Sequence, residues 1–513
     1  MSKFYLTTAI DYANGDPHIG HAYEKVGADA IARYRRLRGD DVHFLIGMDE
    51  HGQKVAQAAA TRGVTPQQQT DEIAESFQAM WRRLGISNDQ FIRTTDDHHK
   101  SGVRALIKRI FDNNPDDFYE RSYKGWYCVG CESFKQDAEI VEGKCVLHPT
   151  RTLEWVEERN WFFRLSKYQD FLKRLHTERP DFLQPETRRN EILSVIDQGL
   201  EDISASRSRL AWGVPFPAPL STGETQTTYV WFDALPNYLT ATGFPAKGYK
   251  DRWPAQLHVI GKDITRFHSI IWPAMLQAAE VSLPERVWAH GFVLLGGERF
   301  SKSAGVKLDL YEAIDRFGPD AFRYYLLREV PFDTDGSFSW ERFEQVYTSE
   351  LANSWGNLAS RAIAMIEKYF DAVVPPAPQT DLDAADAAEL KAYHAAMDGI
   401  GGFMLHEGLR RVMASVTRGN EFVQVSQPWA LAKSPDTRPA LEKTLGTLAR
   451  SLARQAVMLS PFVPTKAQEV WERLGAPGRV EDQRFDALMQ LDATGWRVTK
   501  GEPLFPKPAA TAS

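Results

Sequence analysis

The sequence predicts a chain of the α/β class, with a parallel sheet in its first two thirds and a helical region after it. Three apolar runs, Phe4–Ile10, Val42–Ile46 and Leu257–Ile260, are typical of buried strands. The first two flank a helix-like stretch, Gly20–Arg38, and the order strand, helix, strand indicates a parallel βαβ unit. From about Leu351 the pattern changes to long helices, which predicts a separate helical region.

The helix-like stretch after the first strand begins close to two histidines. Asp16 is expected to be its N-cap and Pro17 its first residue, a position where no backbone donor is needed. His18 and His21 then lie three residues apart on one face of the first turn. Free N–H groups and the helix macrodipole favour an anion there, and Gly20 leaves room for a ligand near the backbone. Taken alone, such a histidine pair is more often structural.

A second segment with phosphate-binding character lies far downstream, at residues 299–303, which read Arg-Phe-Ser-Lys-Ser. It places two cations around two hydroxyls on a loop flanked by glycine, as expected of a mobile phosphate-binding loop. A Ser-Lys-Ser loop alone is usually solvated surface. The two segments occur in order, however, and each follows a strand-like run. Because ligands of parallel sheets bind beyond the carboxyl ends of the strands, the two segments predict an ATP site in two halves.

Bulk composition limits the kind of protein this is. The 513 residues favour several domains, and 43% apolar residues are enough for ordinary globular cores. No run approaches the roughly 20 apolar residues of a membrane span, and the N-terminus shows no signal pattern, so a cytoplasmic protein without a membrane partner is expected. With a formal net charge of −7, any nucleic acid must be bound by local basic faces.

All three cysteines fall in one short stretch. Cys128, Cys131 and Cys145 are followed by His148, which makes the pattern C-x₂-C, a spacer, then C-x₂-H. Two such turns close a tetrahedral zinc site with four protein ligands, and no position is left for a catalytic water. An odd cysteine count in a cytoplasmic chain makes disulfides unlikely. The pattern therefore predicts one structural Zn²⁺ per chain; the alternative is that the cysteines are incidental.

The two phosphate-binding segments resemble the paired signatures of class I aminoacyl-tRNA synthetases, His-Ile-Gly-His and Lys-Met-Ser-Lys-Ser. The second departs from the signature, because Arg299 and Phe300 stand for lysine and methionine, whereas Lys302 is retained. Within the class the chain is most similar to the methionyl-tRNA synthetase family, over nearly its whole length. Ordered matches that carry this resemblance are residues 7–10, 12–15, 47–53, 125–128, 162–168, 229–234, 261–264, 266–268, 272–273, 356–361 and 427–429.

The resemblance implies a Rossmann-type parallel-sheet catalytic domain with a zinc-knuckle insertion, followed by an α-helical bundle that binds the anticodon. The implied boundaries are 1–115 and 222–330 for the two catalytic halves, 116–221 for the connective insertion, 331–350 for a stem-contact linker and 351–513 for the helical domain with a short tail. No appended oligonucleotide-binding barrel is recognisable in the chain, so a monomer is expected.

The resemblance also implies a reaction and its residues. The reaction is activation of L-methionine by Mg²⁺-ATP to methionyl-adenylate, then transfer to the acceptor end of tRNA(Met), for translation initiation and elongation. The catalytic residues implied are His18, His21, Lys302 and Arg299. The ATP-binding residues implied are Gly20, Gly261, Asp263, His290, Gly291, Val293, Ser301 and Ser303. The methionine-binding residues implied are Ala9, Ile10, Tyr12, Asp49, Trp231, Leu235, Tyr238, Phe267, His268 and Trp272, and the anticodon-binding residues are Asn357, Arg361 and Trp429.

The chemistry of methionine fits the residue types of the implied pocket. Its side chain is unbranched, uncharged and polarizable, so a selective pocket should be apolar and aromatic. Asp49 would hold the substrate ammonium, with Tyr12 and His268 as polar groups near the sulfur. Taken singly, Trp231 or Trp272 would instead be an ordinary core aromatic. No segment is long enough for a hydrolytic editing domain, so discrimination must come from the synthetic pocket.

Two other functions remain open from the sequence. One is another class I ligase, charging cysteine or leucine; the closed four-ligand zinc set argues against the first, and the missing editing module against the second. The other is a catalytically inactive paralogue that only binds tRNA. Retention of His18, His21 and Lys302 argues against that alternative.

Overall fold

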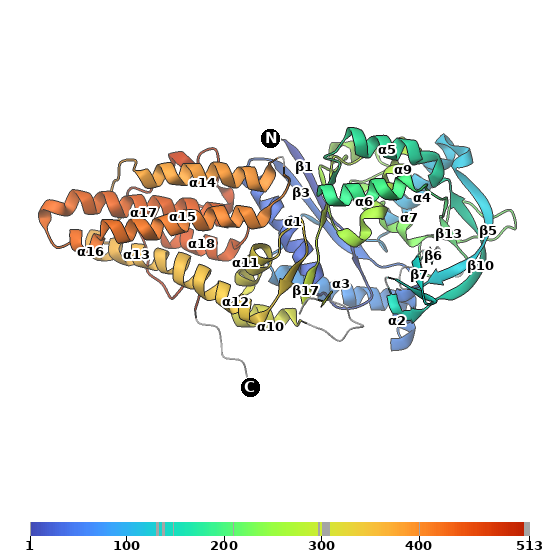
Figure 1. Ribbon diagram of the computed structural model, residues 1–513, viewed down its shortest axis with the longest axis horizontal. Coiled ribbons are helices and arrows are strands. Elements are labelled where there is room, and N and C mark those ends of the chain that lie inside the picture. Colours follow the sequence, from blue (N-terminus) through green and yellow to red (C-terminus); the bar gives the residue numbers. More distant parts are fainter. Residues whose placement is uncertain are drawn as a thin grey trace.

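The computed structural model describes residues 2–129, 133–135, 139–146, 148–208, 210–295, 298–299, 308–399 and 401–506. Its α/β part and its helical part lie side by side along the long axis of the molecule, as Figure 1 shows. The chain enters the central sheet of the α/β part directly, with β1 close to the N-terminus. The predicted division into a sheet-containing part and a later helical part is confirmed.

A parallel sheet forms the centre of the α/β part. Its strand order among the described residues is β11-β16-β15-β1-β3-β2, with β4 beside β3. Every pairing in it is parallel. The strands are β1 (Lys3–Thr8), β2 (Asp11–Tyr12), β3 (Asp41–Asp49), β4 (Gln90–Arg93), β11 (Leu183–Gln184), β15 (Leu257–Gly261) and β16 (Val287–His290). The three apolar runs predicted as buried strands are confirmed as β1, β3 and β15.

The connections of the sheet predict a ligand-binding crevice at the carboxyl end of β1. From β1 the chain passes through α1 (Ile19–Leu37) to β3 on one side, whereas β15 pairs with β1 on the other side. Connections that leave a strand in opposite directions open a crevice beyond its carboxyl end, where ligands of such sheets bind. The ends of β1, β3, β15 and β16 all border this edge, so residues from four distant parts of the chain meet there.

Helices cover the two faces of the sheet and connect its strands. Helix α1 packs on β1, β3 and β15, because Val26, Ala30 and Tyr34 form a buried face along it. The other helices of this part are α2 (Gln53–Arg62), α3 (Pro66–Arg83), α4 (Asp97–Asn113), α7 (Val230–Ala234), α8 (Asn237–Thr240), α9 (Trp272–Ala278), α10 (Leu310–Phe317) and α11 (Pro319–Glu329).

The start of α1 corrects one prediction. The N-cap of the helix is His18, not Asp16, and the first helical residue is Ile19, not Pro17. The reason is a reciprocal pair of hydrogen bonds: the Gly20 N–H donates to His18 Nδ1 at 3.1 Å, and the His18 N–H donates to His21 Nδ1 at 3.2 Å. The imidazoles thus satisfy the exposed amides that the Asp16 carboxylate was expected to satisfy.

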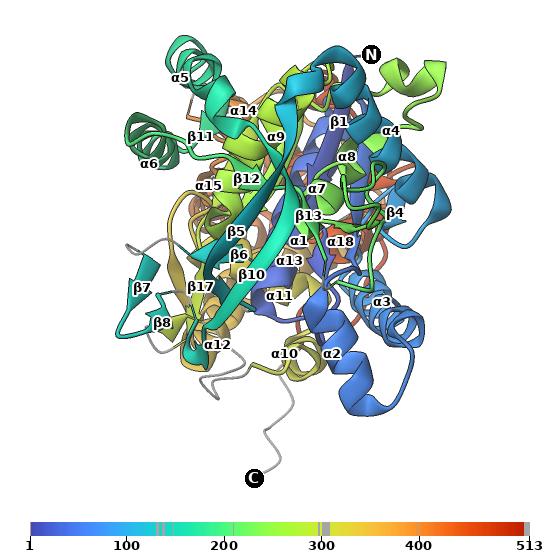
Figure 2. The same ribbon diagram turned by 90° about the vertical axis from the view of Figure 1, so that its right-hand side faces the viewer.

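A long antiparallel ribbon extends from the α/β part. Figure 2 shows β5 (Phe118–Cys128) and β10 (Glu154–Phe163) crossing the near face, with α5 (Gln169–Glu178) and α6 (Glu186–Asp197) to one side. Between these helices β11 returns to the edge of the main sheet beside β16. The smaller strands of this region are β6 (Ser133–Lys135), β7 (Ile140–Val141), β8 (Lys144–Cys145), β9 (His148–Thr152), β12 (Ile203–Ser204), β13 (Ser206–Arg207) and β14 (Thr227–Thr228).

The second part of the chain is a bundle of long helices, as predicted. The predicted break at Gly401-Gly402 separates α14 (Asp381–Asp398) from α15 (Leu405–Ser426). Gly402 has φ +85°, and a Cβ there would lie 2.1 Å from the ring of Trp288, so glycine lets this turn approach β16. The other helices are α12 (Trp340–Val346), a π-helical segment (Tyr347–Gly356), α13 (Asn357–Phe370), α16 (Pro428–Leu431), α17 (Arg438–Leu459) and α18 (Pro464–Arg473). A small sheet, β17 (Val293–Leu295), β18 (Glu298–Arg299) and β19 (Gly336–Phe338), precedes them.

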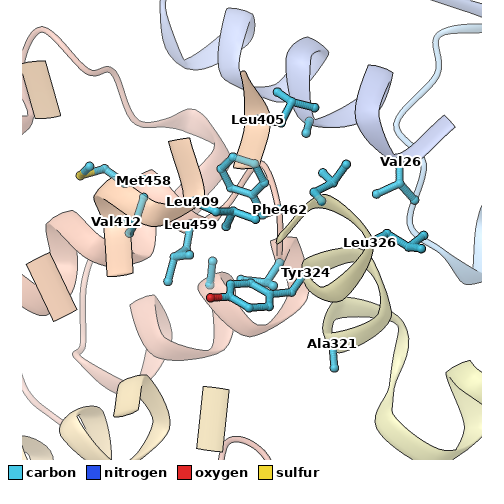
Figure 3. Packing of buried hydrophobic residues seen from close by; sticks show 14 of the residues in the cluster. Val26, Ala321, Tyr324, Leu326, Leu405, Leu409, Val412, Met458, Leu459 and Phe462 are labelled. Atoms are coloured by element: carbon cyan, nitrogen blue, oxygen red, sulfur yellow. The ribbon is translucent and has the colours of Figure 1, made fainter. Parts of the chain in front are cut away.

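One continuous core joins the two parts of the molecule. Val26 of α1, Leu326 of α11, Leu409 of α15 and Phe462, which follows α17, belong to this core and are labelled in Figure 3. Beside them the buried Arg323 guanidinium donates to Asp29 Oδ2 at 2.6 Å and to the carbonyl oxygens of Pro461 and Phe462 at 2.8 and 2.9 Å. The helical bundle is therefore attached to the helix that begins at the two histidines.

Candidate active site

The two histidines predicted to bind phosphate lie against each other at the start of α1. Their ring centroids are 3.6 Å apart with an interplanar angle of 18°. Because both Nδ1 atoms accept backbone N–H groups, each neutral ring carries its proton on Nε2. A Cβ at Gly20 would lie 3.1 Å from His18 Cε1, so the glycine also makes room for the ring. The site therefore has two Nε2–H donors at the positive end of a helix.

Aromatic side chains from three segments form a cluster beside this edge of the sheet. Trp231 and Phe267 stack at 3.7 Å with an interplanar angle of 6°, and His268 meets Trp231 edge-on at 6.3 Å. Trp272 packs against Tyr238 at 6.3 Å. The structure thus brings together residues from α7, α8 and the segment before α9 that are separate in the sequence.

Burial divides the residues predicted to bind methionine into two layers. Those that are partly exposed, and so border the open side of the crevice, are Ala9, Ile10, Tyr12, Asp49, Trp231 and Phe267. Those that are buried behind them are Leu235, Tyr238, His268 and Trp272. Ring contacts join Trp231, Phe267, His268, Tyr238 and Trp272 directly, and most of the inner layer is aromatic. An apolar amino acid side chain fits such surroundings.

The polar group of the inner layer is a neutral histidine. His268 Nδ1–H donates to the Ile264 carbonyl at 3.0 Å, and Tyr238 O–H donates to Nε2 at 2.7 Å. Burial lowers the pKa of His268 to about 4, although the Ile264 carbonyl and nearby carboxylates favour its charged form. Burial likewise raises the pKa of Tyr238 well above its ordinary value. An uncharged pair of this kind suits a neutral thioether better than a charged substrate.

Residues predicted to bind ATP lie at the ends of β15 and β16. Gly261 ends β15, and Asp263 follows it on the exposed surface. His290 ends β16 and Gly291 follows; a Cβ on Gly291 would lie 2.0 Å from the Thr334 carbonyl oxygen, so no side chain fits there. Val293 begins β17 and is buried. These five residues border the side of the crevice opposite β3.

The loop predicted to bind the β- and γ-phosphates falls outside the described residues. Ser301, Lys302 and Ser303 are not described, and of Arg299 only the backbone, in β18, is described. The distance between Lys302 and the histidine pair is therefore not part of the structural description. The roles of these four residues stay predictions.

A buried charged network behind the crevice was missed by the sequence analysis. The Lys25 ammonium of α1 donates to Asp11 Oδ1 and to Glu24 Oε1, both at 2.8 Å, and to the Ala9 carbonyl at 2.9 Å. Glu24 Oε2 in turn meets His290 Nε2 at 3.2 Å. A signal was present: two adjacent charged residues stand in the otherwise apolar and small-residue stretch from Ala22 to Ala28.

A second buried network, also missed, holds the end of β3 against α7. The Asp233 carboxylate bonds His51 Nδ1 at 2.6 Å and His99 Nε2 at 2.9 Å. Burial opposes ionisation of this carboxyl group, but the two histidines outweigh it and lower the pKa of Asp233 to about 2. Because Asp233 lies two residues after Trp231, and His51 two after Asp49, the network fixes both sides of the pocket.

Two of the three residues predicted to bind the anticodon, Arg361 and Trp429, meet on the helical bundle. Asn357 begins α13 and Arg361 follows one turn later. The Arg361 guanidinium lies 5.8 Å from the ring centre of Trp429, which is in the first turn of α16 and is 39% exposed. An exposed indole beside a cation is a suitable surface for a base of single-stranded RNA.

The structure describes the side chains of two of the four predicted zinc ligands. Cys128 and Cys145 are buried in one small cluster with Leu153, and the backbone of Cys145 pairs with that of His148 across β8 and β9. Cys131 and the His148 side chain lie outside the described residues. Among the described side chains no group of three metal ligands is found. Two buried thiols near each other, with His148 in register, are compatible with the predicted zinc site.

Comparison with known proteins identifies the family. Residues 4–152 and 141–363 match the family described as tRNA synthetases class I (M). Residues 375–511 match the anticodon binding domain of methionyl tRNA ligase. The chain belongs to the methionyl-tRNA synthetase family.

Individual members of the methionyl-tRNA synthetase family resemble the chain over its full length. The methionine–tRNA ligase of Caldanaerobacter subterraneus subsp. tengcongensis is 42% identical, over 98% of this chain and 78% of that protein. The methionine–tRNA ligase of Brucella suis is 42% identical, over 98% of both. The solved structure of Mycobacterium tuberculosis methionyl-tRNA synthetase in complex with methionyl-adenylate has a TM-score of 0.92 and 40% identity, covering 99% of this chain and 100% of that one.

Family membership makes the protein a class I aminoacyl-tRNA synthetase and confirms the predicted fold class, a parallel-sheet domain followed by a helical anticodon-binding domain. In the described part of the chain, no helix combines the length and the apolar character that a membrane span requires.

Proposed function

We propose that the protein activates L-methionine with ATP and transfers it to tRNA(Met) in the crevice beyond β1. The observation that carries this proposal is the meeting of two chemistries at one sheet edge. A stacked histidine pair with two Nε2–H donors begins α1, and an aromatic pocket with a neutral histidine lies beside it. A triphosphate and an uncharged, polarizable side chain are the substrates that these two surfaces fit.

In the first step the methionine carboxylate attacks the α-phosphorus of ATP, pyrophosphate leaves, and methionyl-adenylate forms. No side chain needs to act as nucleophile, because positioning and electrostatic stabilisation account for phosphoryl-transfer catalysis. His18 and His21 donate their Nε2–H groups to phosphate oxygens that gain charge. Lys302 holds the β- and γ-phosphates with help from Arg299, Ser301 and Ser303. Gly20, Gly261, Asp263, His290, Gly291 and Val293 border the phosphates, ribose and adenine.

Methionine is held in the two-layered pocket. Asp49 binds the substrate ammonium, a charge-assisted contact that also orients the carboxylate. Tyr12 and the partly exposed Trp231 and Phe267 surround the side chain, and the inner layer behind them sets the depth of the pocket. The neutral Tyr238–His268 pair is near the sulfur and rejects charged side chains, because burying an unpaired charge there is costly.

In the second step the terminal adenosine of tRNA attacks the activated carbonyl and AMP leaves. The helical bundle selects the tRNA through its anticodon: a base stacks on Trp429, with Asn357 and Arg361 beside it. The Arg361 position over the exposed indole supports this role.

The proposal includes two metal ions. Mg²⁺ bound with ATP would neutralise phosphate charge. Cys128, Cys131, Cys145 and His148 would hold one Zn²⁺, which would supply structural stability to the insertion and no catalytic water. The buried positions of Cys128 and Cys145 support this assignment.

The decisive experiment is exchange of radiolabelled pyrophosphate into ATP with each of the twenty amino acids, with and without tRNA. Methionine alone should support exchange, and exchange should not require tRNA. Lys302→Ala should slow single-turnover adenylate formation by about 10²-fold or more, the usual cost of removing a transition-state donor, with little change in methionine affinity. An enzyme that exchanges with cysteine or leucine, or with no amino acid, would refute the proposal.

A further inference from the structure

The buried ammonium of Lys25 has no capacity left for a substrate. An ammonium has three N–H donors, and each finds an acceptor: Asp11 Oδ1 and Glu24 Oε1 at 2.8 Å, and the Ala9 carbonyl at 2.9 Å. The Lys25 side chain is 0% exposed. Lys25 can therefore affect the reaction only through the groups that its ammonium binds.

Those groups belong to the wall of the methionine pocket. In the extended segment that follows β1, the side chains alternate: Ile10 and Tyr12 are partly exposed, whereas Asp11 between them is only 4% exposed. Since alternate residues of an extended chain point to opposite sides, holding Asp11 inward directs Ile10 and Tyr12 toward the crevice. The Ala9 carbonyl, bound to the same ammonium, fixes the segment one residue before Ile10.

Among the described residues, Lys25 is the only hydrogen-bond partner of the Asp11 carboxylate. Within that part of the chain Asp11 Oδ2 is buried without a partner, so the bond of Oδ1 to Lys25 alone compensates for the buried charge. Burial raises the pKa of Asp11 to about 7, even though Lys25 lowers it. Without the ammonium, this carboxylate would have to be protonated or leave its place, and either change would move the pocket wall.

The network continues from the methionine side to the nucleotide side. Glu24 accepts from Lys25 with Oε1 and meets His290 Nε2 with Oε2 at 3.2 Å. The other ring nitrogen of His290 lies 2.7 Å from the Gly291 carbonyl. The His290 ring thus lies between the Glu24 carboxylate and a backbone carbonyl. Asp11, Lys25, Glu24 and His290 form one continuous chain of hydrogen-bonding groups that joins the two sides of the site.

We propose that Lys25 is a positioning residue for methionine. Its ammonium connects the Ala9–Tyr12 segment to α1 and, through Glu24, to His290. These bonds fix the position of the pocket wall relative to the histidine pair. This assignment rests on the proposed function, because it takes Ile10 and Tyr12 as methionine contacts. It assigns Lys25 no contact with either substrate.

The test is pyrophosphate exchange with methionine and ATP varied separately. In Lys25→Met, which keeps the length of the side chain, the KM for methionine should rise about tenfold or more. The KM for ATP should stay within about threefold of the wild-type value, because the histidine pair keeps its own backbone hydrogen bonds. Lys108→Met is the matched control, since Lys108 is exposed on α4 and bonds only Asp112 among the described residues; it should change neither KM.

A double variant separates positioning from simple charge compensation. In Lys25→Met with Asp11→Asn, no unpaired carboxylate remains, so the thermal midpoint should recover toward that of the wild type. The methionine KM should stay raised, because the bonds to Ala9 and Glu24 are still missing. Full recovery of the methionine KM in the double variant would overturn the proposal, as would a folded Lys25→Met with unchanged methionine KM or with equal rises in both KM values.

Two further outcomes are decisive. Should Lys25→Met fail to fold, Asp11→Asn alone carries the test: it weakens one bond of the ammonium and should raise the methionine KM by about threefold, and an unchanged value would overturn the proposal. Absence of methionine-dependent exchange in both the wild type and Lys108→Met would refute the proposed function itself. Exchange in the wild type with no effect in any Lys25 or Asp11 variant would refute only the role of Lys25.

Discussion

The hydroxyl group of Tyr238 offers a sharp test of the methionine pocket. In Tyr238→Phe the ring keeps its packing against His258 and Trp272, at 4.4 and 6.3 Å, and only the donor to His268 Nε2 at 2.7 Å is lost. His268 Nδ1–H stays bound to the Ile264 carbonyl, so Nε2 becomes a buried acceptor without a donor. Leaving such a group unsatisfied costs about 1–3 kcal/mol.

That cost predicts a change in binding. If this free-energy cost destabilises the conformation of the pocket that binds methionine, the affinity for methionine weakens about 5- to 150-fold. Pyrophosphate exchange with methionine varied at saturating ATP measures this change, and the KM for ATP should be unaffected. A folded Tyr238→Phe protein with a methionine KM within twofold of the wild type would show that the hydroxyl does not orient His268 for the substrate.

A matched variant in the same cluster serves as control. Tyr5 O–H donates to the Tyr238 backbone carbonyl at 2.8 Å and does not touch His268. Tyr5→Phe removes one buried hydroxyl from the same core, so it should lower the thermal midpoint comparably. It should leave the methionine KM unchanged. Equal effects of the two variants on the methionine KM would mean that loss of core stability, not loss of the bond to His268, is responsible.

Three other predictions follow from the remaining features. Burial lowers the pKa of His268 from 6.5 to about 4. Its contribution to the free energy of unfolding, about 3 kcal/mol, should therefore be present above pH 6.5 and be lost as the pH falls toward 4. Denaturation midpoints across this pH range should fall less steeply for His268→Gln than for the wild type. Trp429→Ala should raise the KM for tRNA, in line with a stacking energy of about 1–3 kcal/mol, and leave pyrophosphate exchange intact. Val425→Ala, at a site that is 83% exposed against 39% for Trp429, should change neither. Equal loss of both activities in Trp429→Ala would point to misfolding. Metal analysis should find one zinc per chain in the wild type and less in Cys128→Ser, with a lower thermal midpoint; a full zinc content in that variant would exclude Cys128 as a ligand.

Several elements of the fold could be predicted because their signals are local. The apolar runs that became β1, β3 and β15, and the break at Gly401-Gly402, depend on residues close together in the chain. The three-residue spacing of His18 and His21 likewise predicted that they share a face. The N-cap was predicted wrongly, because an aspartate is a common cap and the pattern does not reveal that imidazole Nδ1 atoms take the amides instead.

The second layer of the candidate site could not be predicted in this way. Lys25 and Asp11 are 14 residues apart, and His51 and Asp233 are 182 apart. Periodicity states that a position faces the interior, but it does not state which distant residue meets it there. A charged residue on a buried face indicates that a partner exists; only the packing of α1 on the sheet identifies that partner.

By itself the sequence predicted the α/β class followed by helices, a histidine pair suited to phosphate and, through its resemblance to a known family, the residues expected around the substrates. The tertiary structure alone decided the capping and the tautomer of that pair, the two layers of aromatic residues and the partners of the buried charged groups behind them. The division has a physical cause. Backbone geometry repeats over a few residues and is written in neighbouring side chains, whereas hydrogen bonds between distant segments depend on how the sheet orders its strands.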